Sequence, residues 1–290
     1  MTDWAAFAGF TGVILAVLLA LAHLSRGIPH ADGGDPYFDR DADSRAAAVD
    51  DDSDADSSEA RPVDSNTTHG EADGTHHDAP APSGAPFPPM GEDSVPSPDI
   101  PPQMLLANVA VSQGLLGVFL VTSVWYTSVP VSALGLSFTG LPSKLALGVA
   151  LGIALYAVNR AGTSVSREFG LVPDESLRET LTPETAAGWA LLLFAVLPLI
   201  AGFEELLFRG ALVGAISVGF DVSPWFMATL SSVAFGVGHG AQGRLGIVVT
   251  GLLGFVLAAA FVLTESLVVV VVAHYLVNAL EFVCHHLFGW

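Results

Sequence analysis

Three short polar stretches interrupt otherwise apolar sequence, and their residue types could support hydrolysis. The first, GFEELLFRG at residues 202–210, holds two adjacent glutamates and an arginine. Positions four apart share a helix face, whereas adjacent positions point about 100° apart. Glu205 and Arg209 can therefore form a charge-neutralising pair, and Glu204 points elsewhere, on the side of Phe208. Taken alone, this stretch is also compatible with a structural ion pair beside a protonated glutamate.

The other two polar stretches follow further along the chain. SSVAFGVGHG carries His239 four residues after Phe235, and HYLVN carries His274 and Asn278 four residues apart. If these groups converge on Glu204, they provide a carboxylate base, two imidazoles and an amide donor. Such groups can activate water and stabilise a developing oxyanion, as amide hydrolysis requires. A glutamate and two histidines are equally the ligands of a catalytic zinc site with an open position.

The elements that must position these residues are hydrophobic helices. Of the 290 residues, 51% are hydrophobic, and a transmembrane helix needs roughly 20 apolar residues to cross about 30 Å of hydrocarbon. Long apolar runs without alternation predict helices, which satisfy their own backbone groups in lipid. We predict an all-α, polytopic transmembrane helix bundle of about seven spans: Trp4–Leu24, Met104–Tyr126, Leu141–Asn159, Ala187–Val218, Pro224–Gly240, Leu245–Leu263 and Ser266–Phe288.

Ionisable residues inside such spans point to a function. An ionised side chain at mid-bilayer costs at least about 2.5–3.5 kcal/mol on insertion scales, so it faces the bundle interior. A lone histidine in a bundle is more often a hydrogen-bonding residue than a catalyst, but three spans with motif residues four positions apart favour a shared site. Residues 187–217 as one helix would be about 46 Å long, with Glu204 near the middle. Tilt, or a break near Pro198 or Gly202, is needed to bring the two histidines level with it.

The three stretches together resemble a known family. EELLFR, FGVGH and HYLVN match, in order, the E-E-x-x-x-R, F-x-x-x-H and H-x-x-x-N motifs of the CPBP intramembrane endopeptidases. This family comprises type II CAAX prenyl endopeptidases and bacteriocin-processing or self-immunity proteins. The resemblance covers about residues 140–290. Each motif alone is weak, but three in order, each on its own hydrophobic span, are specific.

The resemblance implies a role for each matching residue. Glu204 would be the general base that activates water together with His239, and His274 and Asn278 would stabilise the oxyanion. The family has been described both as metalloproteases and as glutamate proteases that need no metal. We favour the glutamate–water mechanism, because the compact H-E-x-x-H pattern that holds zinc on one helix is missing from the motifs. No metal is therefore assigned; if zinc binds, its ligands are Glu204, His239 and His274.

Four further residues are expected to support the catalytic groups: Glu205, Arg209, Phe235 and Glu281. Glu281 shares a helix face with His274, seven residues earlier, and could be its hydrogen-bonding partner. The alternative is a carboxylate that nears the membrane interface at the helix end.

The sequence also divides the chain and indicates its environment. We expect an N-terminal span at 1–25, a disordered acidic linker at 26–101 and a protease-like membrane domain at 102–290, with the motifs in about 187–290. The net charge is −19, with 29 acidic against 10 basic residues. Such an acidic, lysine-poor chain suits a halophilic source and lacks the basic surface that nucleic-acid binding needs. The expected partners are the lipid bilayer and a membrane-anchored protein or peptide substrate.

The arginines predict the orientation in the membrane. Five arginines lie in the segments that connect the predicted spans on one side of the membrane: Arg26, Arg160, Arg167, Arg178 and Arg244. The positive-inside rule places this side, and with it the C-terminus, in the cytoplasm.

Two functions other than proteolysis stay open. A catalytically silent relative could act as a membrane binding or immunity protein, although its motifs are intact. A proton-coupled transporter could use Glu204 and the histidines as a relay, but transporters more often show paired repeats with interrupted helices, and we find none in this sequence.

Overall fold

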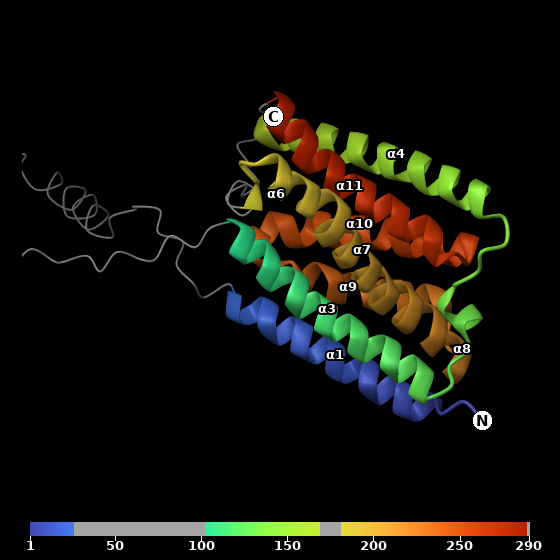
Figure 1. Ribbon diagram of the computed structural model, residues 1–290. Helices are drawn as coiled ribbons and strands as arrows, with labels where there is room; N and C mark the ends of the chain where they lie inside the picture. The colour runs from blue at the N-terminus through green and yellow to red at the C-terminus, as the bar shows by residue number, and fades with distance from the viewer. Residues whose placement is uncertain (26–101, 169–180, 289–290) are drawn as a thin grey trace, which may run out of the picture. The chain divides into compact units, whose positions relative to one another are not determined.

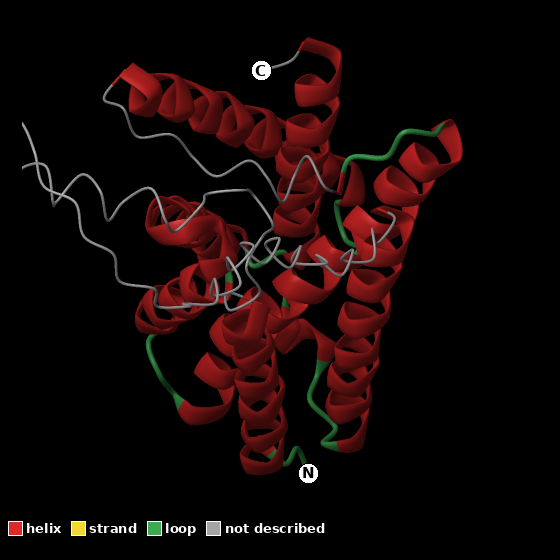
Figure 2. Ribbon diagram, turned by 90° about the vertical axis from the view of Figure 1, so that its left-hand side faces the viewer, coloured by secondary structure: helices red, strands yellow, loops and turns green. Residues whose placement is uncertain are grey.

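The computed structural model describes residues 1–25, 102–168 and 181–288. The acidic linker predicted at 26–101 lies outside them. The described residues are helical and contain no strand (Figure 2). The α-helices are α1 (Trp4–Ser25), α3 (Pro102–Tyr126), α4 (Leu141–Glu168), α6 (Ala186–Leu191), α7 (Leu197–Glu205), α8 (Ile216–Phe220), α9 (Pro224–Gly238), α10 (Gly243–Thr264) and α11 (Leu267–Phe288). The described residues also form two π-helices, η2 (Leu192–Val196) and η3 (Leu206–Ala215). Two short 3₁₀ helices are η1 (Val131–Leu134) and η4 (Gly240–Gln242).

The predicted polytopic membrane bundle is confirmed. Within the described residues, six helices are long and apolar enough to cross a membrane. The stretch predicted as another span at Pro224–Gly240 forms α9, which has 15 residues. At 1.5 Å per residue it is about 22 Å long, less than the roughly 30 Å of a hydrocarbon core. It still runs back between α8 and α10, so the chain crosses the bundle in alternating directions (Figure 1).

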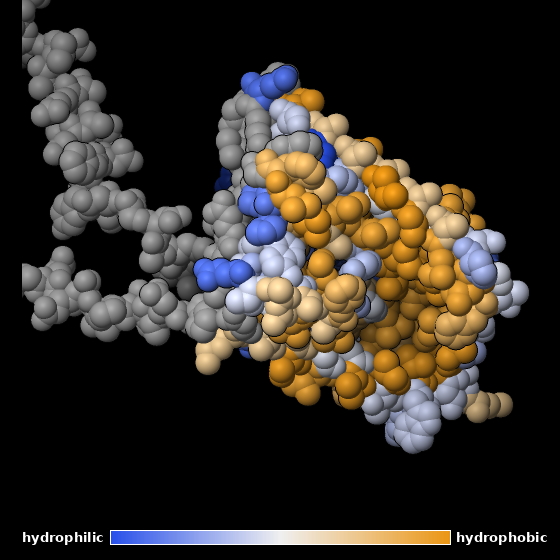
Figure 3. All heavy atoms as spheres, turned by 45° about the horizontal axis from the view of Figure 1, so that its top comes forward, coloured by the Kyte–Doolittle hydropathy of each residue, from blue (hydrophilic) through white to orange (hydrophobic). Residues whose placement is uncertain are grey.

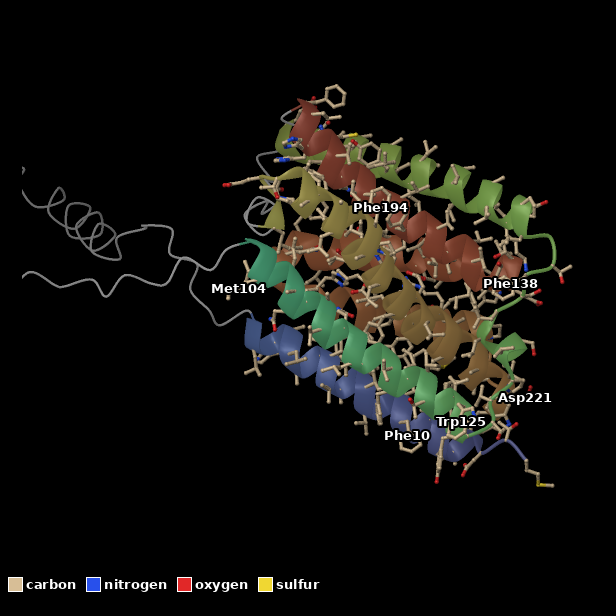
Figure 4. All side chains as sticks on the ribbon, viewed as in Figure 1. Phe10, Met104, Trp125, Phe138, Phe194 and Asp221 are labelled. Atoms are coloured by element: carbon tan, nitrogen blue, oxygen red, sulfur yellow. The ribbon has the colours of Figure 1, made fainter. Side chains whose placement is uncertain are left out.

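Exposed apolar side chains mark the lipid-facing surface. Hydrophobic residues dominate the flank of the bundle in Figure 3. On α3, Met104 and Trp125 at its two ends are 65% and 79% exposed, and Phe194 of η2 is 78% exposed (Figure 4). In water such a surface would drive aggregation, whereas in lipid it is solvated. The chain is therefore an integral membrane protein.

The motif-bearing helix Ala186–Phe220 is continuous, with no break at Gly202. Its irregularities are the π-helices on either side of α7. Pro198 stands at the start of α7, directly after η2, and its missing N–H removes one helical hydrogen bond there. π-helical turns in α-helices are frequent at functional sites, and η3 begins immediately after Glu205.

Two glycines let the histidine-bearing helices approach their neighbours. A Cβ on Gly152 of α4 would lie 2.9 Å from the Ala273 carbonyl oxygen, next to His274 on α11. A Cβ on Gly236 of α9 would lie 2.7 Å from the Ile247 carbonyl oxygen on α10. Small residues at such contacts allow helix backbones to pack closely in a membrane.

Helix α1 packs in the same compact unit as the other described helices. The backbone N–H of Asp3 donates to the Thr127 carbonyl at 2.9 Å, and the Thr2 hydroxyl donates to the Ser128 carbonyl at 3.0 Å. The side chains of Phe7 and Ile14 are fully buried in a core that α1 shares with α3 and η3.

Candidate active site

Three of the predicted catalytic residues meet inside the bundle. Glu204 stands near the end of α7, His239 caps the C-terminus of α9, and His274 lies in α11. The Nε2 atom of His239 is 4.0 Å from Glu204 Oε2, and the Nε2 atom of His274 is 3.8 Å from the same oxygen. Glu204 is 6% exposed and His274 3%. The structure therefore brings a buried carboxylate face to face with two imidazoles.

Glu205 links the arginine to His274. Its Oε1 atom accepts a hydrogen bond from Arg209 Nη1 at 2.8 Å and another from His274 Nδ1 at 2.7 Å. Arg209 Nη2 donates to the Gly254 carbonyl of α10 at 2.7 Å. Glu205 and Arg209 are both fully buried. A buried ion pair is stable only when additional hydrogen bonds offset its desolvation, and these bonds tie η3 to α10 and α11.

Phe235 packs at the centre of the site. The Arg209 guanidinium carbon lies 4.6 Å from its ring centroid, and the ring makes an edge contact with Phe208 at 5.0 Å. The His239 ring is tilted against it at 4.5 Å. Cation–π and aromatic contacts of this kind hold flat groups in fixed orientations. Phe235 therefore orients the arginine that binds Glu205 and the imidazole that faces Glu204.

Hydrogen bonds determine which imidazole nitrogens face Glu204. His239 Nδ1 is 2.8 Å from the Phe235 carbonyl oxygen, which can only accept, so Nδ1 carries the hydrogen. His274 Nδ1 likewise donates to the Glu205 carboxylate. Both Nε2 atoms are then directed at Glu204 Oε2, which is buried without a hydrogen-bond partner among the described residues.

The separations between these atoms leave room for a bridging water molecule. In a tetrahedral zinc site with ligand distances near 2.0–2.1 Å, two ligand atoms are about 3.4 Å apart. The two distances to Glu204 Oε2 are longer, at 3.8 and 4.0 Å. In the part of the chain that the structure describes, no group of three His, Cys, Asp or Glu side chains is arranged to hold a metal ion. One water can bridge polar atoms at such separations.

Asn278 and Glu281 lie further along α11 than His274. Asn278 is half-buried one turn after His274, and its amide makes no hydrogen bond to Glu204, His239 or His274. Glu281 accepts a hydrogen bond from Asn159 Nδ2 of α4 at 2.6 Å. The carboxylate that binds His274 is Glu205, so the partnership expected of Glu281 is corrected. Seven residues along a helix give the same face but about 10 Å of axial distance, too far for a direct contact.

Two residues of the site were missed by the sequence analysis. Ser231 of α9 donates from its hydroxyl to the Phe208 carbonyl of η3 at 2.7 Å and is buried. Gly254 supplies the carbonyl for Arg209, and a Cβ there would lie 2.9 Å from Phe235 Cδ1. A serine or a glycine within an apolar span is the available signal, because such residues mark contacts between membrane helices.

One family model matches the part of the chain that holds these residues. Residues 186–280 match the family model described as type II CAAX prenyl endopeptidase Rce1-like. These residues form an Rce1-like domain. The Rce1-like domain is about a third of the chain, starts with α6 and ends within α11. It includes Glu204, His239, His274 and Asn278, and the resemblance to the CPBP endopeptidases is confirmed over this range. No curated protein and no solved structure matches the chain.

Proposed function

We propose that the chain is an intramembrane endopeptidase that hydrolyses a peptide bond of a membrane-associated protein or peptide. One observation carries the proposal. The buried, unpartnered Oε2 atom of Glu204 faces the Nε2 atoms of His239 and His274 at 4.0 and 3.8 Å. Such an arrangement suits a carboxylate that holds and deprotonates a water molecule. The Rce1-like domain supports the same class, a CAAX-type endopeptidase.

In the proposed reaction, Glu204 is the general base. It takes a proton from a water that His239 helps to orient, and the water oxygen attacks the peptide carbonyl carbon. The resulting oxyanion is stabilised by His274 and Asn278. When the tetrahedral intermediate collapses, the C–N bond breaks and Glu204 returns the proton to the leaving amine. Placing donors where the negative charge develops is the largest contribution in many hydrolases.

The hydrogen bond to Glu205 orients His274 for the role of donor. With Nδ1–H bound to Glu205, His274 can donate to the oxyanion only from Nε2, which takes the imidazolium form, and this atom lies 3.8 Å from Glu204 Oε2. Glu205 is then a positioning residue, since it acts through His274.

Cleavage of a peptide pool by the purified protein, in detergent and high salt, tests the proposal. The variants are Glu204→Gln and His239→Ala, each compared with the unaltered chain with and without a strong chelator. We expect both variants to lose hydrolysis and the chelator to change nothing. Activity that the chelator abolishes and zinc restores would assign Glu204, His239 and His274 as metal ligands instead.

The same experiment separates the proposal from a silent binding or immunity function. A silent relative would hydrolyse no member of the pool, and Glu204→Gln would leave its binding intact. The chemistry of the site does not select between prenylated and unmodified substrates, so the pool contains peptides with and without a C-terminal prenyl-cysteine motif.

A further inference from the structure

A stripe of four polar residues runs along α11 from the buried site toward the C-terminal end of the helix. Its members are His274, Asn278, Glu281 and His285. At 100° per residue they fall within about 60° of one another, and at 1.5 Å per residue they extend over about 16 Å. Burial decreases along the stripe: His274 is 3% exposed, and the three later residues are only half-buried.

The two flanks of this polar stripe are apolar and packed. On one flank, Ala273 and Leu276 contact Gly152 of α4. On the other, Tyr275, Ala279 and Phe282 pack in a hydrophobic cluster with residues of α6 and η2. The polar stripe therefore lies between two helix contacts. Residues exposed to lipid would instead be mostly apolar, as most of the exposed residues of α3 are.

Polar groups on α4 continue the stripe across to the neighbouring helix. Asn159 Nδ2 donates to Glu281 at 2.6 Å. One turn earlier, the Tyr156 hydroxyl is shielded beside the Cys284 thiol without a hydrogen bond of standard geometry. Sulfur is a weak hydrogen-bond partner, and a buried polar group without a protein partner is usually satisfied by water. The contact between α4 and α11 therefore contains polar side chains that water would solvate: Tyr156, Asn159 and Glu281.

We propose that the polar stripe is a hydrophilic inlet, through which water and exchangeable protons pass between the C-terminal end of α11 and Glu204. The role of the inlet in supplying the hydrolytic water rests on the proposed endopeptidase function. The entry of water along the polar stripe does not depend on that function, because it requires only that water penetrates the bundle there. Each turnover of a hydrolase consumes one water molecule, and this water must reach the buried Glu204.

Cysteine accessibility tests the inlet directly. In a Cys284→Ala background, the chain carries no other cysteine, so single cysteines can be placed along α11. The variants are Glu281→Cys on the polar stripe and Leu280→Cys and Phe282→Cys on its two flanks at nearly the same depth. Each protein is reconstituted in vesicles and treated with a charged, membrane-impermeant maleimide. The thiolate is the reacting species, so we expect the stripe position to react about tenfold or more faster than either flank.

A second variant keeps the test decisive if Glu281→Cys does not fold. His285→Cys leaves the bond between Asn159 and Glu281 intact, and Val283→Cys, on the opposite face of α11 two residues away, is its matched control in the same Cys284→Ala background. Faster labelling of His285→Cys than of Val283→Cys, from the side of the vesicle that the C-terminus faces, supports the inlet. Equal, slow labelling of stripe and flank positions would overturn it and leave the stripe as a dry contact between α4 and α11. Peptide hydrolysis is not read in these measurements, so a failure of the inlet is distinct from a failure of the endopeptidase.

Discussion

His274 is held by Glu205, through a 2.7 Å hydrogen bond from its Nδ1 atom to the same carboxylate oxygen that accepts from Arg209. This relationship separates the roles of two adjacent glutamates. Glu205 is occupied by two donors, whereas Glu204 turns its Oε2 atom to the Nε2 atoms of both histidines. Both donors bind one oxygen of Glu205, and its Oε2 atom is buried without a hydrogen-bond partner among the described residues, as Glu204 Oε2 is. What distinguishes Glu204 is that its unpartnered oxygen faces both imidazoles, where a bound water can be deprotonated.

Replacing Glu205 should therefore impair catalysis indirectly. In Glu205→Gln the side chain keeps its shape, but the carboxylate that accepts from His274 Nδ1 and Arg209 is replaced by a neutral amide. We expect kcat to fall by about 10–100-fold with KM little changed, as when the hydrogen-bond partner behind a catalytic histidine is removed. Steady-state kinetics, compared with Glu204→Gln, measures this. A rise in KM with kcat unchanged would mean that Glu205 does not act through His274.

Arg209→Ala should destabilise the bundle strongly. It leaves the Glu205 carboxylate buried without its counter-charge, which typically costs about 3–5 kcal/mol. Arg209→Lys should recover only part of the loss, because one ammonium cannot reproduce the guanidinium fork that reaches both Glu205 and Gly254. Denaturant unfolding in micelles measures the effect, with the exposed Arg244→Ala as control. Equal stability of the two alanine variants would contradict the structural role of the buried pair.

Two neighbouring serines offer a matched pair. Ser231 donates across the helix interface to the Phe208 carbonyl of η3, whereas Ser232 donates to the Ala228 carbonyl of its own helix. Ser231→Ala removes a buried hydrogen bond between two helices and should cost about 0.5–1.5 kcal/mol, while Ser232→Ala removes a bond within one helix and should cost less. The difference in unfolding free energy checks this. A larger loss at Ser232 would show that the contact between α9 and η3 does not depend on Ser231.

Gly254→Ala should reduce activity more than stability. The added Cβ would lie 2.9 Å from Phe235 Cδ1 and 3.3 Å from Arg209 Nη2, so both side chains must move. Since Phe235 also orients His239, we expect kcat to fall about tenfold or more, in line with the sensitivity of catalysis to small displacements. Gly162→Ala is the control, because a Cβ at that exposed glycine of α4 meets no atom within 4 Å. Peptide hydrolysis and thermal unfolding of both variants test this prediction. Equal activity of the two variants would show that Gly254 does not help to position the catalytic side chains.

The orientation of the bundle is a separate prediction. α4 ends, α10 begins and α11 ends at the same side of the bundle (Figure 1), so Arg160 and Arg244 lie on the side of the C-terminus. By the positive-inside rule we expect this side in the cytoplasm. A reporter fused to the C-terminus, active only in the cytoplasm, tests it. Activity of a reporter that works only outside the cytoplasm would reverse the topology.

The sequence by itself determined the helical class, most of the spans and the identity of the polar groups inside them. Apolar runs of about 20 residues leave no other backbone structure in lipid than the helix. The spacing of Glu205 and Arg209 predicted their pairing, because four residues along a helix return to the same face. These inferences use local geometry alone, which is why they could be made without a structure.

Only the tertiary structure decided what lies across from each polar group. His274 is hydrogen-bonded to Glu205, and Glu281 to Asn159. These pairings depend on the axial position of α11 relative to α4 and α7. Glycine contacts and the π-helical turns set this position. The shortness of α9, which stops at Gly238, likewise places His239 at a helix end facing Glu204. Periodicity gives the face of a helix but not its axial position against a neighbour, so the pairing of side chains between helices is a property of the packed bundle.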